Sequence, residues 1–171
     1  MMRPVKRAVI GSFVALAALV LVACGDKPAT SVPGLFFPTG KDEQGGAMMD
    51  ALYRGPLVVR DGCVLIGHAE GYALPVWWKG FTAERNDEGK LAVRDGDGAV
   101  IAIEGETFEM GGGYTAEFGP AGIKTEPRAE QIQRLEEWLG YPIPERCLGP
   151  DVGGVWGVGS TDPLPPDPSP S

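Results

Sequence analysis

The residue types that could carry out chemistry are few in this chain. His68 is the only histidine, and Cys63 precedes it at an odd spacing. If both residues lie on one strand, their side chains point to opposite faces, which argues against a Cys-His dyad. With one histidine, a zinc site lacks ligands, so neither a metal nor another cofactor is expected. Serine hydrolysis is disfavoured because no G-x-S-x-G pattern exists, and the serines after residue 30 lie near the two ends: Ser31, Ser160, Ser169 and Ser171.

Carboxylates are the next candidates. Asp95, Asp97, Gly98 and Glu104 match part of the calcium-loop pattern D-x-[DN]-x-[DN]-G-x5-E. The first ligand position of that pattern is occupied by Val93, however, and strand patterns rather than helices flank the loop. We therefore interpret residues 95–98 as a hairpin turn.

Glu104 and Glu106 would project to one face of a continuous strand, as the paired acids of a glycoside hydrolase do. Gly105 lies between them and predicts a turn instead. The pair supports only an alternative function, that of an envelope hydrolase acting through carboxylates in a surface cleft. No catalytic residue is assigned.

Two adjacent tryptophans suggest a binding surface. In a strand, Trp77 and Trp78 point to opposite faces, so one ring enters the core and the other points outward. An outward ring with Phe81 nearby would form a stacking platform for a sugar or a peptide. The alternative is that the helix or the apolar segment 35–37 covers it. These three aromatic residues are the candidate ligand contacts.

The N-terminal residues have the pattern of a secretory signal. Three basic residues precede an apolar run, Ala8–Ala23, which is shorter than the roughly 20 residues that cross a bilayer. The end of the run, LVAC at 21–24, resembles the lipobox of bacterial lipoproteins. This resemblance implies that residues 1–23 are removed and that Cys24 is acylated with diacylglycerol. An ordinary signal peptide with a stray cysteine, or an uncleaved anchor, is the alternative.

Lipidation would place the protein in the cell envelope, anchored to the membrane and facing outside the cytoplasm. If the organism has two membranes, sorting habits of that family favour the outer one, because Gly25 rather than Asp follows Cys24. Acylation of Cys24 leaves Cys63 and Cys147 as an even pair in an oxidising compartment. We predict that these two form a disulfide, with two separate buried thiols as the alternative.

The charge of the chain excludes one class of partner. The formal net charge is −8, and loss of residues 1–23 removes three cations and no anion, which leaves −11. An acidic surface repels phosphate backbones, so no nucleic-acid binding is expected.

Composition divides the chain into four parts. The signal peptide is followed by a tether rich in Pro, Gly, Ser and Thr over residues 24–47, and a Pro-rich segment at 160–171 predicts a disordered tail. Between them, residues 48–159 predict one small domain. Pro127 at one end and Gly140 at the other bound a predicted amphipathic helix over 128–139, which we expect to plug a barrel end or cover an open edge.

Short β-branched runs separated by turn residues predict a mainly β fold. Asp61-Gly62 predicts a two-residue hairpin, and a meander of such strands closes into a small antiparallel, OB-like barrel or a sandwich. The expected strands are 57–60, 63–66, 72–78, 91–94, 99–104 and 107–110, the last running into a corner at the glycines 111–113.

Over roughly residues 55–159, the order of these features resembles small β-domains of bacterial envelope lipoproteins. The shared features are a G-C strand, a Trp strand, a D-G turn, a G-G-G corner and a late cysteine beside an aromatic strand. The resemblance implies architecture and no activity. The expected function is therefore a non-enzymatic binding or structural module, whose partners are the bilayer, through Cys24, and an envelope protein or glycan.

Overall fold

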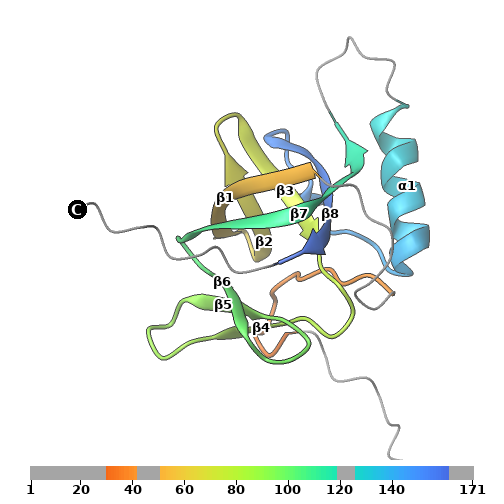
Figure 1. Ribbon diagram of the computed structural model, residues 1–171. Helices are drawn as coiled ribbons and strands as arrows, with labels where there is room; N and C mark the ends of the chain where they lie inside the picture. The colour runs from red at the N-terminus through yellow and green to blue at the C-terminus, as the bar shows by residue number, and fades with distance from the viewer. Residues whose placement is uncertain (1–29, 42–50, 119–125, 162–171) are drawn as a thin grey trace, which may run out of the picture.

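The computed structural model describes residues 30–41, 51–118 and 126–161, and the fold is mainly β, as predicted (Figure 1). Five strands close into a barrel in the order β1-β2-β3-β8-β7, and three more form a separate sheet in the order β4-β5-β6. The strands are β1 (Ala51–Arg60), β2 (Cys63–His68), β3 (Gly71–Val76), β4 (Thr82–Arg85), β5 (Leu91–Arg94), β6 (Val100–Ile103), β7 (Thr107–Glu117) and β8 (Val152–Ser160). Helix α1 (Arg128–Leu139) and the 3-10 turn η1 (Glu145–Cys147) lie between β7 and β8.

The first hairpin forms as the sequence predicts. Arg60 pairs with Cys63, and the two turn residues have positive φ angles of 50° at Asp61 and 72° at Gly62. Asp and Gly tolerate this conformation, and such turns match the right-handed twist of the flanking strands. Register in the β1–β2 pair is thereby set by the turn.

The barrel does not close as a simple meander. After β3 the chain leaves the barrel to build the small sheet, and it returns as β7, which pairs with β1. β8 then enters between β7 and β3 and runs parallel to β3. The predicted meander is therefore correct within β1–β3 and for the β5–β6 pair, but it lacks β4 and is wrong for the closing strands.

The predicted glycine corner at 111–113 is also wrong, because β7 continues through it to Glu117. The β7–β8 register shifts once within this stretch, between Gly111 and Gly112, and once after it, between Tyr114 and Ala116. Gly112 has a φ of 146°, and a Cβ there would lie 2.1 Å from the Gly157 carbonyl oxygen. The glycine thus lets two backbones approach within the barrel wall, instead of ending the strand.

Alternating side chains divide the apolar residues into two clusters. Val64 and Ile66 of β2 point into the barrel, whose interior is continuous with the core of the small sheet around Leu91 and Val93. Leu65 of β2 and Leu74 of β3 point outward into a second cluster. The barrel wall is therefore apolar on both faces where a second layer covers it.

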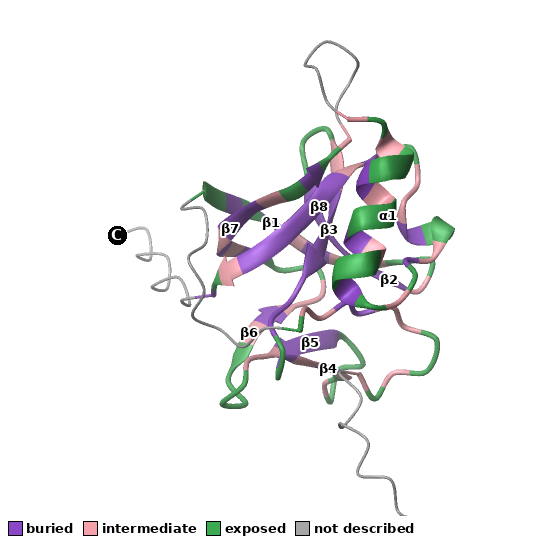
Figure 2. Cartoon of the chain, turned by 90° about the vertical axis from the view of Figure 1, so that its right-hand side faces the viewer, coloured by how far each residue is buried: buried purple, intermediate pink, exposed green. Residues whose placement is uncertain are grey.

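Helix α1 provides that second layer. Its bounds are those predicted, but it lies along the outer face of the barrel, and neither plugs an end nor covers an open edge (Figure 2). Leu135 and Leu139 pack on the outer cluster, and Gln131 is the third buried residue of the helix. The Gln131 amide accepts a hydrogen bond from the Glu117 N–H and donates to its carbonyl, which fixes the helix to the end of β7.

Residues 30–41 form an ordered N-terminal arm, so the predicted tether over 24–47 is wrong for this part. Backbone bridges join Thr30 to Ala83, Phe36 to Cys63 and Thr39 to Trp77. Phe37 is buried and stacks on Trp77, with ring centroids 5.4 Å apart. The apolar segment 35–37 interrupts the tether composition because it belongs to the core.

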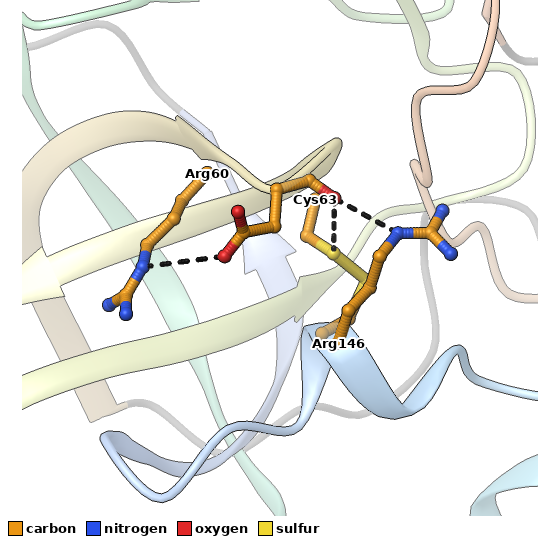
Figure 3. The surroundings of a disulfide bond; sticks show 5 residues. Arg60, Cys63 and Arg146 are labelled. Carbon is orange, nitrogen blue, oxygen red and sulfur yellow. Dashed lines mark hydrogen bonds and ion pairs between the residues drawn. A yellow bond between two sulfur atoms is a disulfide. The ribbon is translucent and has the colours of Figure 1, made fainter.

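Cys63 and Cys147 form a disulfide, as predicted (Figure 3). The bond joins the first residue of β2 to η1, and both residues are 0% exposed. Beside it, the Arg146 Nε donates to the Asp61 carbonyl at 2.9 Å. The disulfide therefore ties the segment after α1 to the β1–β2 turn.

The remaining boundaries are settled in part. The predicted tail started at residue 160, but β8 extends to Ser160 and Thr161 is buried. The first two residues assigned to the tail therefore belong to the domain. The signal peptide, Cys24 and residues 42–47 and 162–171 lie outside the described residues. Within the described ranges, no helix combines the length and apolar character needed to cross a membrane.

Candidate ligand-binding groove

Helix α1 leaves part of the outer barrel face uncovered, and this part is hollowed. The groove has a volume of about 610 Å³. Pro56 and Val58 of β1 and Tyr72 of β3 give it an apolar lining. The other lining residues are Arg54, Gly55, Gly67, His68, Ala69, Gly71 and Thr107.

Pro56 explains why the hydrogen-bonded ladder between β1 and β2 ends beside the groove. The Leu57 N–H donates to the Glu106 carbonyl, on the β7 side of β1. Because N–H groups alternate in direction along a strand, the N–H at position 56 would point to β2, and proline has none. The β1–β2 ladder accordingly ends at the Leu57–Ile66 pair, while β1 continues along β7.

The polar groups of the groove are mainly hydrogen-bond donors. Arg54, whose side chain is 65% exposed, lies 3.4 Å from the Glu109 carboxylate and has further N–H groups to offer. The His68 Nδ1 accepts a hydrogen bond from the Glu70 N–H at 3.1 Å, so the neutral ring carries its proton on Nε2. Thr107 adds a hydroxyl. Among the described residues that line the groove, none has a carboxylate.

An ion pair holds Tyr72 in place at one side of the groove. The Arg60 guanidinium lies over the Tyr72 ring, 5.3 Å from its centroid, and forms a salt bridge with Asp151. The Tyr72 N–H donates to the Asp151 carbonyl at 2.8 Å. The hydrogen bond from Arg60 lowers the pKa of the Asp151 carboxyl below its ordinary value of 3.8.

This lowered pKa predicts an acid-sensitive contribution to stability. A carboxyl with a lower pKa in the folded state stabilises the protein above its ordinary pKa, and the contribution is lost as pH falls through the folded-state value. We expect the urea midpoint of the wild type to fall more steeply below about pH 4 than that of an Arg60→Met variant. Equal slopes in the two proteins would contradict the pairing.

Beneath His68, the barrel interior holds an aromatic cluster. The Tyr53 ring lies edge-on to His68 at 5.9 Å and to Trp156 at 4.9 Å, and Tyr114 completes the group. Burial raises the pKa of Tyr53, and the neighbouring Tyr114 phenol adds to the shift. The phenol thus stays protonated and neutral, and the cluster supports the groove from below.

The predicted aromatic platform is not on the surface. Trp77, Trp78 and Phe81 are 1%, 8% and 2% exposed. The expectation that one tryptophan points outward is wrong because β3 ends at Val76, so strand alternation stops before the pair. Trp77 then stacks between Phe37 and Phe108, and the Trp78 indole donates to the Gly159 carbonyl at 3.0 Å.

The carboxylates singled out in the sequence lie at turns and strand ends. The Asp95 carboxylate accepts from the N–H groups of Asp97 and Ala99, as the hairpin interpretation predicts. Glu104 accepts from the Leu91 N–H at 2.9 Å and lies after the end of β6. Glu106 is exposed, beyond a turn in which Gly105 has a φ of 84°. Glu104 and Glu106 are therefore not neighbours on one strand face.

A second hollow, of about 480 Å³, lies between α1 and the segment that follows it. Its polar groups serve the fold: Glu136 accepts from the Ile143 N–H, and Arg128 donates to the Leu148 carbonyl. The groove on the barrel, with exposed donors over an apolar floor, is the better candidate site. No protein-family model, curated protein or solved structure matches this chain significantly, and the groove is interpreted from its own chemistry.

Proposed function

We propose that this chain is a lipid-anchored protein of the bacterial cell envelope whose β-domain binds an envelope glycan without catalysis. In this proposal, residues 1–23 are a signal peptide, Cys24 is acylated, and the groove around Tyr72 holds the sugar. The bilayer to which it is anchored is the outer membrane where two are present.

The anchor is supported by the sequence around LVAC and by the disulfide. A basic start, a short apolar run and a cysteine at its end are the features of a lipoprotein signal. A disulfide between Cys63 and Cys147 fits an exported domain, since such bonds persist outside the reducing cytoplasm. Two or three acyl chains on Cys24 would hold the domain firmly, whereas one chain binds marginally.

The observation that carries the binding function is the donor-rich groove. Its volume of about 610 Å³ lies within the range of small-molecule sites, which are largely apolar with a few placed polar groups. Donors from Arg54 and Thr107 match a ligand whose hydroxyl and carbonyl oxygens accept hydrogen bonds. OB-like barrels bind oligosaccharides on the corresponding strand face.

The arrangement favours binding over hydrolysis. A glycoside hydrolase needs two carboxyl groups about the scissile bond. The lining of the groove within the described residues contains none, and Glu104 is hydrogen-bonded in a turn of the small sheet.

The proposal is tested by calorimetric titration of the exported Cys24→Ser form with soluble oligosaccharides of alternating N-acetylglucosamine and N-acetylmuramic acid. We expect binding that weakens about tenfold or more in Arg54→Ala and Tyr72→Ala, because truncation at a contact costs at least about 1.4 kcal/mol. Gln133→Ala, on the exposed side of α1, serves as the matched control. An absence of binding, or equal binding by all variants, would overturn the glycan proposal, as would tighter binding of an extended peptide without sugar.

A further inference from the structure

The arm and the groove lie at opposite ends of the β2–β3 hairpin. Phe36 bridges to Cys63, the first residue of β2, and Thr39 bridges to Trp77, directly after β3. Because β2 and β3 are antiparallel, these two positions belong to the same end of the hairpin. The other end is the turn after His68, where the groove is lined by His68 and Gly71.

The arm is held in this position by contacts along its length. The Phe36 N–H donates to the Gly62 carbonyl at 2.7 Å, and the Trp77 N–H donates to the Pro38 carbonyl at 2.9 Å. The Tyr141 hydroxyl both accepts from the Thr39 N–H and donates to its carbonyl, each at 2.9 Å. The arm is therefore part of the domain, and its direction is fixed relative to the groove.

Only five residues separate the lipidation site from this fixed arm. Thr30, the first described residue of the arm, bridges to Ala83 in β4. β4 starts six residues after the end of β3, which is the end of the β2–β3 hairpin that the arm contacts. A fully extended chain spans about 3.5 Å per residue, so Cys24 lies within about 20 Å of Thr30. Such a link is too short to let the domain turn over freely on the membrane.

We infer that the domain is held on the bilayer with a fixed polarity: the arm end of the β2–β3 hairpin and the small sheet face the lipid, and the groove faces away. This inference rests on the proposed anchor. It adds that the groove is presented to ligands beyond the membrane surface rather than to the lipid headgroups.

An exposed aromatic side chain at the same end fits this orientation. Trp138, near the C-terminal end of α1, is 41% exposed. Its ring lies beside Gly40 of the arm, where a Cβ would be 3.4 Å away. Figure 1 shows that end of α1 on the same side of the molecule as β4–β6. Tryptophan is enriched where an apolar phase meets water, which is the environment expected at this end.

The orientation is tested on the full-length lipidated protein in phosphatidylcholine vesicles that carry an acceptor dye on a headgroup. Donor dyes are placed by Lys79→Cys at the arm end of β3 and by Glu70→Cys at the groove end, both exposed positions. The native disulfide is fully buried, so an added cysteine is the accessible thiol. β3 is about 16 Å long and separates the two labelled positions. We therefore expect the label at position 79 to lie nearer the lipid than the label at position 70, and to transfer energy to the headgroup dye more efficiently.

Equal transfer from the two labels, or greater transfer from the Glu70 label, would overturn the orientation. The mass of the N-terminal peptide from the same preparation separates the two proposals. An acylated Cys24 with reversed transfer overturns the orientation alone. A peptide without lipid overturns the anchor and, with it, the orientation that depends on it.

Discussion

Replacing Cys63 and Cys147 together by alanine is expected to lower the free energy of unfolding by about 3–5 kcal/mol. The bond closes a loop between residues 84 positions apart, and a long loop is costly to order without a cross-link. Both sulfurs lie in the outer apolar cluster with Leu65 and Leu135, so truncation also leaves a cavity there. Urea denaturation of the exported, lipid-free protein measures the difference.

The Cys24→Ser variant is the common background for this comparison, because its change lies outside the described domain. Reductant is expected to shift the urea midpoint of that variant downward and to leave the double alanine variant unchanged. A midpoint insensitive to reductant in the background protein would show that the disulfide does not stabilise the domain. Separate loss of either cysteine should cost most of what the loss of both costs, since each breaks the same bond and leaves only a smaller cavity.

Gly112→Ala is expected to destabilise the barrel by about 3 kcal/mol. The new methyl group would lie 2.1 Å from the Gly157 carbonyl oxygen and 2.7 Å from the Trp156 Nε1. Neither neighbour can move cheaply, because one is backbone of β8 and the other belongs to a buried ring. The φ of 146° is also one that residues with a side chain rarely adopt.

Gly111→Ala, one residue earlier in the same glycine stretch, is the matched control. A Cβ there would meet the Ser160 hydroxyl at 2.4 Å, but this is the end of a side chain that can rotate away. We expect a loss well below that of Gly112→Ala, measured by thermal unfolding under identical conditions. Similar losses in the two variants would show that the close approach of the β7 and β8 backbones does not limit substitution.

Local patterns predicted much of the fold. The Asp61-Gly62 turn, the boundaries of α1 and the disulfide partner of Cys63 follow from turn chemistry, helix end signals and cysteine counting, each of which depends on a few residues. Closure of the barrel depends instead on pairings between distant segments. The parallel pairing of β3 with β8 cannot be recognised from nearby residues, because the two strands are far apart in the sequence. Its register depends on how all the strands of the barrel fit together.

The groove was missed for a related reason. Alternation along β1 places Arg54, Pro56 and Val58 on one face, and a proline inside a strand pattern indicates an interrupted ladder. That signal was available in the sequence. The proline did not show that α1 would leave this face of β1 uncovered. Nor did it show that Tyr72 of β3 would join Pro56 and Val58 in the apolar lining of the groove. The tryptophans misled because strand alternation was extended two residues beyond the end of β3.

The position of β8 has a consequence for biogenesis. Among the strands of the described residues it is synthesised last, yet it lies between β3 and β7 in the barrel wall. A chain emerging with its amino end first therefore leaves both of those strands with a free edge until residue 160 has appeared. Free edges recruit other strands, so nascent copies are most prone to self-association in this interval. A chaperone that shields β-edges should raise the yield of this protein more than that of a meander barrel of equal length.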